Sequence, residues 1–123
     1  MALFAQQISY TPLAWKALMR NPENRLLAVQ EVVSRLGGRV VAGWYSFGPF
    51  DAMVIVELPD NISATALSIA VSAGGAMGAV TTVPLISMED GVAALSRASD
   101  AAYEPPRSEI PYFGIYSTKE DLA

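Results

Sequence analysis

Three side chains between residues 45 and 57 carry groups that can move a proton: Tyr45, Asp51 and Glu57. Asp51 follows the Gly48-Pro49 turn at the start of an apolar run, so its carboxylate could act as a general base at a strand end. Asp at such a position more often accepts hydrogen bonds from turn amides, and we favour that use. A buried Glu57 would be a credible acid or base. Because Pro59 follows closely, we favour a solvated carboxylate there.

A second set of residues suits ligand binding rather than reaction. The candidates are four aromatic residues and one cation, namely Tyr10, Trp15, Trp44, Tyr45 and Arg39. The aromatic residues could line a pocket for a planar ligand, although large aromatics at strand positions are more often part of the core. Arg39, together with Lys16, could hold an anionic ligand near a strand end, although single surface cations usually have no such role.

The residue types exclude several kinds of site. The chain has no cysteine and no histidine, which removes disulfides, thiolate chemistry, Cys/His zinc sites and histidine-based triads. We find no metal-binding constellation and expect no cofactor. The glycine-rich segment 74–78 follows a predicted helix and precedes a predicted strand, which is the wrong order for a phosphate loop.

Composition describes a globular protein without an affinity for nucleic acid. Of the 123 residues, 52% are hydrophobic and 16% are charged, a balance opposite to that of disordered chains. The net charge is −4 and there is no run of basic residues, whereas a nucleic-acid-binding face must neutralise phosphates.

Residues 61–88 carry no charge, which is enough length to span a bilayer as one helix. Gly74, Gly75 and Gly78 interrupt the segment, and a β-branched run with Pro84 follows, so we predict helix, turn and strand and no membrane span. The N-terminal residues lack the basic start of a secretory signal, so we expect a cytoplasmic protein.

Turn and cap signals divide the rest of the chain into elements. We predict a strand over 3–10, a helical region over 12–36 in two pieces that begin at Thr11-Pro12 and Asn21-Pro22, and a stop at Gly37-Gly38. Strands over 39–47 and 51–58 form a hairpin. A helix over 62–74 and a strand over 79–87 follow, and Ser87 with Asp90 opens a last helix to residue 98.

This order, β-α-β-β-α-β with a terminal helix, is typical of an α+β ferredoxin-like fold with a four-stranded antiparallel sheet. In the hairpin, simple alternation points Val40, Ala42 and Trp44 to one face and Val41, Tyr45 and Phe47 to the other, and both faces are mostly apolar. Because the helices cover only one face, we expect a second copy of the chain on the other, giving a homodimer or a larger homo-oligomer.

Composition also sets a domain boundary. We assign residues 1–98 to the ferredoxin-like domain and 99–123 to a C-terminal arm that is rich in proline and aromatic residues. The arm holds four of the chain's 11 aromatic residues, which a solvated linker rarely does, so we predict that it lies extended on the body or on a neighbouring subunit.

Three segments together resemble the GYD-domain family of small bacterial and archaeal proteins: 36–38 (Leu-Gly-Gly), 44–51 (Trp-Tyr-Ser-Phe-Gly-Pro-Phe-Asp) and 54–60 (Val-Ile-Val-Glu-Leu-Pro-Asp). Thr11, Pro22 and the segment 78–82 also fit the family's pattern, and the resemblance covers about residues 3–98. Phe50 departs from it, since the family has Tyr there. The resemblance implies a ferredoxin-like chain that pairs into a dimeric α/β barrel, and it implies no settled biochemical activity.

Two classes of function follow. The first is a homo-oligomeric barrel that binds a small, largely apolar molecule or serves a structural role. The second is a cofactor-independent enzyme of the dimeric α/β-barrel type, performing proton transfer or oxygenation with Tyr45, Asp51 or Glu57 in place of the absent histidine. A cavity that reaches all three side chains would favour the enzyme.

Overall fold

The computed structural model describes residues 1–106, which form one antiparallel sheet and four helices. The strands are β1 (Ala2–Tyr10), β2 (Arg39–Tyr45), β3 (Ala52–Leu58) and β4 (Met77–Leu85). The helices are α1 (Pro12–Arg20), α2 (Arg25–Arg35), α3 (Asn61–Ala73) and α4 (Met88–Ala101). The predicted order of strands and helices is confirmed, and each predicted element overlaps the observed one.

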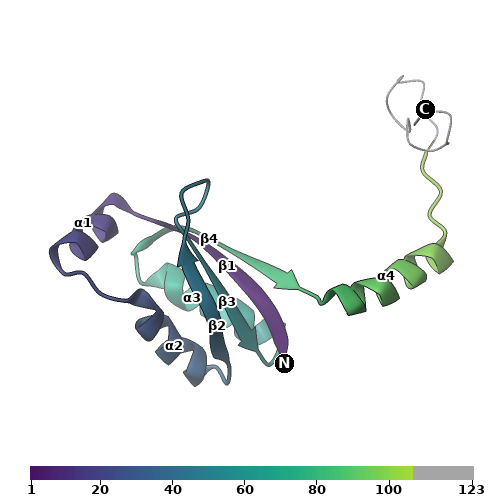
Figure 1. The fold of residues 1–123 in the computed structure, drawn as a ribbon, viewed down its shortest axis with the longest axis horizontal. Coiled ribbons are helices and arrows are strands. Elements are labelled where there is room, and N and C mark those ends of the chain that lie inside the picture. The colour runs from purple at the N-terminus through teal and green to yellow at the C-terminus, as the bar shows by residue number, and fades with distance from the viewer. Residues whose placement is uncertain (107–123) are drawn as a thin grey trace. The chain divides into compact units, whose positions relative to one another are not determined.

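The four strands pair in the order β2-β3-β1-β4, and every neighbouring pair is antiparallel (Figure 1). The first and third strands lie in the middle, with the hairpin partner β2 and the last strand β4 at the edges. This is the predicted α+β ferredoxin-like arrangement.

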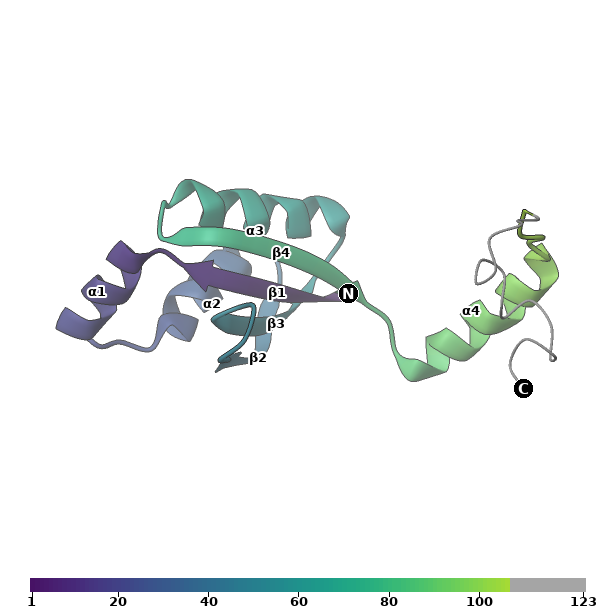
Figure 2. The ribbon, with the colours of Figure 1, turned by 90° about the horizontal axis from the view of Figure 1, so that it is seen from above.

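Helices α2 and α3 supply one side of a single core beneath the sheet. Every second residue of β3 is buried, which is the pattern of a strand with one covered face. Figure 2 shows α3 running along the sheet beside β4. The buried apolar cluster consists of Phe4, Ile8, Val33, Ala52, Val54, Val56, Leu58, Ala64 and Leu67.

The predicted orientation of β2 is wrong because a β-bulge interrupts the strand. Val40 lies opposite Val56, but the next paired residue, Ala42, lies opposite Ile55. The extra residue shifts the alternation, so that Val40 and Tyr45 share the helix-covered face while Ala42 and Trp44 lie on the other. The bulge therefore directs Tyr45 toward α2.

Helix α2 begins later than the Asn21-Pro22 signal predicts. Asn21 caps the C-terminus of α1, and the N-cap of α2 is Asn24, whose side chain accepts a hydrogen bond from the Leu26 amide at 3.0 Å. Glu23 thus precedes the helix. The N-cap role of Thr11 is confirmed, since its hydroxyl accepts from the Ala14 amide at 3.2 Å.

The chain divides into two compact units, the first ending at Ile86 and the second beginning at Ser87. In the second unit, Ser87 caps α4 by accepting from the Asp90 amide at 2.9 Å, as predicted. Helix α4 continues to Ala101, three residues into the predicted arm, and residues 107–123 of that arm lie outside the described part of the chain. Among the described residues, no helix has the length and apolar character required to cross a membrane.

Candidate functional site

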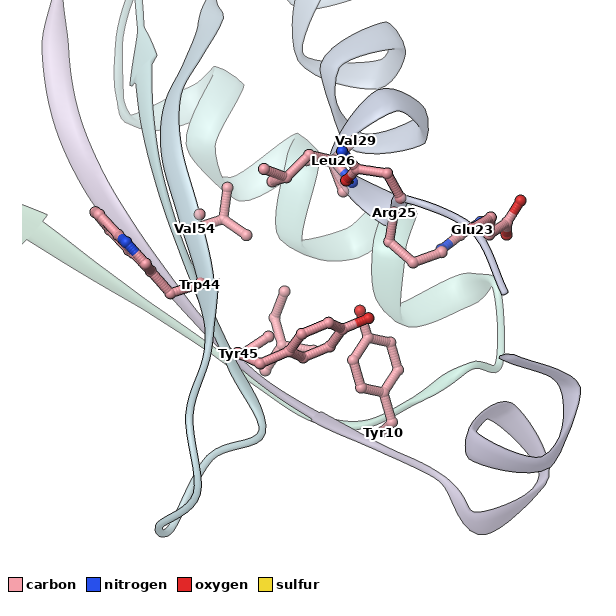
Figure 3. A pocket seen from close by; sticks show the side chains of 12 residues that line it. Tyr10, Glu23, Arg25, Leu26, Val29, Trp44, Tyr45 and Val54 are labelled. Atoms are coloured by element: carbon pink, nitrogen blue, oxygen red, sulfur yellow. The ribbon is translucent and has the colours of Figure 1, made fainter. Parts of the chain in front are cut away.

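A pocket of about 330 Å³ lies between the N-terminal end of α2 and the helix-covered face of the sheet. Its walls come from β1, β2, β3 and from α2 with the two residues before it (Figure 3). Ordinary small-molecule sites occupy about 300–1,000 Å³, so the pocket fits a ligand at the small end of that range.

The floor of the pocket is apolar. Five side chains form it: Ile8, Leu26, Val29, Ala52 and Val54. Two small residues shape this floor, because Ala52 projects little and Gly43 has no side chain. A Cβ on Gly43 would lie 2.5 Å from Cδ2 of Leu26, so Leu26 packs directly against the β2 backbone.

Tyr10 stands at the rim, at the point where β1 leaves its ladder with β3. That ladder ends at the Ile8–Ala52 pair, and the Tyr10 amide donates instead to Oδ2 of Asp51 at 2.8 Å. The Asp51 amide in turn donates to the Ile8 carbonyl at 2.8 Å. Asp51 therefore fixes the backbone that carries Tyr10. Its carboxylate does accept from a main-chain amide, but from across the sheet and not within its own turn.

Three aromatic rings cluster beside the pocket. The Trp15 ring on α1 lies 5.0 Å from the Tyr10 ring in an edge-on arrangement and 5.8 Å from the Tyr45 ring. Such contacts hold rings in place through their quadrupoles as well as by burial. Tyr10 and Tyr45 line the pocket, whereas Trp15 supports both rings from outside it. Trp44 also borders the pocket, but its ring points to the other side of β2 (Figure 3).

The surroundings of the Tyr10 phenol change its acidity. Its pKa is raised, first because burial penalises the charged phenolate and second because Tyr45 lies nearby. Asp51 acts in the same direction, and the Arg25 guanidinium partly opposes them. Tyr10 therefore stays protonated at neutral pH and presents a hydrogen-bond donor.

Arg25, the first residue of α2, lines the pocket together with Glu23 and Asn24. Its Nη1 atom donates to Oε1 of Glu23 at 2.7 Å, and the two side chains are 36% and 50% exposed. The sequence interpretation missed Arg25, because a single arginine after Asn24 looks like any exposed helix residue. The N-cap signal of Asn24 could have placed it at the start of α2.

Two of the predicted residues lie at the opposite end of the hairpin. Arg39 and Glu57 face each other across β2 and β3, and their side chains form an ion pair of 3.0 Å. Neither lines the pocket. Lys16 is exposed on α1. Of the three proton-transfer candidates, the pocket reaches Tyr45 but neither Asp51 nor Glu57.

Within residues 1–106, no group of three or more acidic side chains is placed to hold a metal ion. The site consequently consists of an apolar floor, two phenols and one arginine–glutamate pair.

Comparison with known protein families identifies the family of this chain. A family model described as the GYD domain matches residues 4–95, which is most of the chain and all four strands. Searches of curated proteins and of solved structures found no match.

Proposed function

Since the chain belongs to the GYD-domain family, we propose that it is a homo-oligomeric protein that binds a small, largely apolar molecule in the pocket beneath α2. The observation that carries the proposal is the hollow itself. Elsewhere under α2 the core is filled, with Val33, Val56 and Leu58 fully buried, whereas the N-terminal end of the helix stands over an apolar space. The proposal also includes a cytoplasmic location.

The test compares how a neutral probe binds to the native protein and to a variant whose pocket is filled by a larger side chain. N-phenyl-1-naphthylamine fluoresces strongly only in apolar surroundings, so its fluorescence in a titration reports occupancy. We expect saturable binding to the native protein and a loss of at least tenfold in affinity for Ala52→Leu, which places three more carbons in the floor.

The matched control is Ala70→Leu, because Ala70 is exposed on α3 and outside the pocket. It adds the same carbons and should leave probe binding unchanged. If the probe fails to bind the native protein, or if Ala52→Leu binds it normally while folded, the binding function is wrong and a structural role is left.

The homo-oligomer rests on the sheet face that α2 and α3 do not cover. Six large apolar side chains lie along it, namely Leu3, Trp44, Met53, Ile55, Val83 and Leu85, and none of them is buried. The charges along these strands on that face are Arg39 and Glu57, which neutralise each other. A mostly apolar face whose two opposite charges are already paired suits the same face of a second copy, so a second copy is the occupant we propose.

Sedimentation velocity tests this interface. Trp44→Arg and Ile55→Lys place a charge on the uncovered face, and we expect each to shift the native protein from dimer to monomer. Ala70→Lys adds the same kind of charge on α3 and should leave the oligomer intact. A monomeric native protein, or a folded Ile55→Lys variant that remains dimeric, would contradict the interface.

The enzyme alternative retains one supporting observation, the protonated phenol of Tyr10 beside Tyr45, which could donate to a developing oxyanion. The weaker part of the enzyme alternative is its general base. Glu23 is the carboxylate among the residues that line the pocket, and Arg25 already binds it. Binding without turnover is therefore the better supported function. Mass spectrometry of a probe incubated with the protein would reverse this order if it detected a converted product.

A further inference from the structure

Polar and apolar groups are separated within the pocket. The aliphatic floor occupies one part, while the polar lining residues Tyr10, Glu23, Asn24, Arg25 and Tyr45 gather around the N-terminal end of α2 and the adjoining rim. Figure 3 shows the hydroxyl ends of Tyr10 and Tyr45 pointing toward the side of the pocket where Arg25 lies. A ligand that fills the space must therefore be apolar at one end and polar at the other.

We propose that this ligand is an amphiphilic monoanion: a compact apolar molecule with one carboxylate, which binds Arg25 and the hydroxyls of Tyr10 and Tyr45. The inference rests on the proposed binding function and adds the chemical class of the ligand. Three features of the polar end support it.

The first feature is the state of Arg25. Guanidinium carries five N–H donors, and the bond to Glu23 uses Nη1, which leaves donors for a carboxylate ligand. The pair with Glu23 is solvent-exposed, and exposed ion pairs contribute little to stability, so a ligand carboxylate can replace Glu23 at small cost. Arg25 is also the cation among the lining residues, which suits one negative charge better than two.

The second feature is the pair of phenols. Tyr10 and Tyr45 both line the pocket, Trp15 contacts both rings, and Figure 3 shows their hydroxyl ends on the side of the pocket where Arg25 lies. Phenol hydroxyls that donate to a carboxylate form short, charge-assisted hydrogen bonds. They also select for an oxygen acceptor at the end of the ligand.

The third feature is the positive electrostatic potential at the N-terminal end of α2. Asn24, Arg25 and Leu26 are the N-cap and first turn of α2, and the positive end of the helix dipole adds to the guanidinium charge. The opposing charge is Glu23, on the same rim. Asp51, which also influences Tyr10, has its carboxylate bound to the Tyr10 amide. Removing the charge of Glu23 should therefore strengthen the binding of an anion.

A matched pair of probes separates charge from apolar contact. 2-Naphthoate and 2-naphthamide share one ring system and differ in the charge of the end group, and isothermal titration calorimetry gives both affinities. We expect the native protein to bind the carboxylate about tenfold more tightly, the ratio that corresponds to 1.4 kcal/mol.

Substitutions then test which side chains cause the preference for the carboxylate. Arg25→Met keeps most of the side-chain length and should abolish the preference while 2-naphthamide binds as before. Glu23→Gln should raise the affinity for 2-naphthoate alone, and Tyr45→Phe should lower it. All three changes lie at exposed or half-exposed positions, and far-UV circular dichroism checks that each variant is folded.

The outcomes distinguish this inference from the function beneath it. Equal binding of the two probes that Ala52→Leu abolishes would overturn the anionic class and leave the binding function standing. A carboxylate preference that persists in Arg25→Met would likewise overturn the assignment. If neither probe binds the native protein, the proposed function and the inference fall together.

Discussion

The two ends of α2 lie over the same sheet but pack very differently. At the C-terminal end, Val33 and Leu58 are fully buried, and Gly38 sits so close to β3 that a Cβ would lie 2.1 Å from the Glu57 carbonyl oxygen. We call this the closed end. At the N-terminal end, which we call the open end, Arg25 and Leu26 line the pocket.

The difference shows that the hollow is a local feature and not loose packing of the whole core. The closed end follows from Gly37 and Gly38, which end the helix and let the chain turn back tightly into β2. The open end follows from Ala52, whose small side chain leaves room in the floor, and from the bulge that directs Tyr45 to the rim. One end stabilises the fold and the other is available for a ligand.

The largest expected effect comes from a substitution that removes packing at the closed end. Leu58→Ala removes a side chain with no exposed surface and should cost about 2–5 kcal/mol in the free energy of unfolding. The same change at the open end, Leu26→Ala, should cost less than half as much, because Leu26 is already partly exposed. Urea denaturation at one protein concentration measures both. Equal losses would mean that the two ends are packed alike.

A glycine substitution tests the tight packing of the closed end by adding a methyl group there. Gly38→Ala places a methyl group against the Glu57 backbone and 2.7 Å from Leu58 Cδ2, and we expect a loss of about 1–3 kcal/mol. Gly48→Ala is the matched control, since a Cβ there meets nothing within 4 Å. A native-like melting temperature for Gly38→Ala would contradict the tight approach of the helix end to β3.

A third change addresses the support of the open end. Thr11→Ala removes the N-cap of α1, the helix that carries Trp15, and should cost about 1 kcal/mol. Because Trp15 contacts both Tyr10 and Tyr45, its fluorescence should change as well. Thr11→Ser keeps the hydroxyl and should preserve both stability and spectrum. If Thr11→Ala leaves both unchanged, α1 does not hold the aromatic cluster.

Local signals in the sequence predicted the elements that these changes affect. Thr11 and Ser87 are caps whose bonds span three residues, and Gly37-Gly38 is a helix stop, so each could be identified from its neighbours. The apolar runs predicted the strands, and the order of elements predicted the ferredoxin-like sheet. These parts of the fold depend on chain-local chemistry.

The pocket could be predicted only in part, because it depends on contacts between distant residues. The bond from the Tyr10 amide to Asp51 joins residues 41 positions apart, and the bulge in β2 is visible only once Ala42 is paired with Ile55. Arg25 matters because of what lies below it, which its neighbours in sequence do not reveal. Residue type makes Tyr10, Trp15 and Tyr45 candidates for an aromatic pocket, but their assembly at one end of α2 depends on tertiary contacts.

The smallest expected effect is a change in the pH dependence of stability, which Tyr10 at the open end should cause. Since the pKa of Tyr10 is raised in the folded protein, the fold favours the neutral phenol. That contribution is complete below the unfolded value of about 10 and is lost as the pH rises through the folded pKa. Stability should therefore fall as the pH rises above about 10, and Tyr10→Phe should remove part of that slope. Urea denaturation at pH 9 and pH 11 gives the comparison.

Tyr103→Phe is the matched control for this titration, because Tyr103 is largely exposed and lies in the second unit. It removes one phenol without changing the pocket, so its pH slope should equal that of the native protein. Burial is the main cause of the shift at Tyr10, and a molecule bound over the phenols would bury them further. A native slope in Tyr10→Phe would mean that water reaches the Tyr10 hydroxyl freely, and the open end would then be a surface dimple and not a pocket.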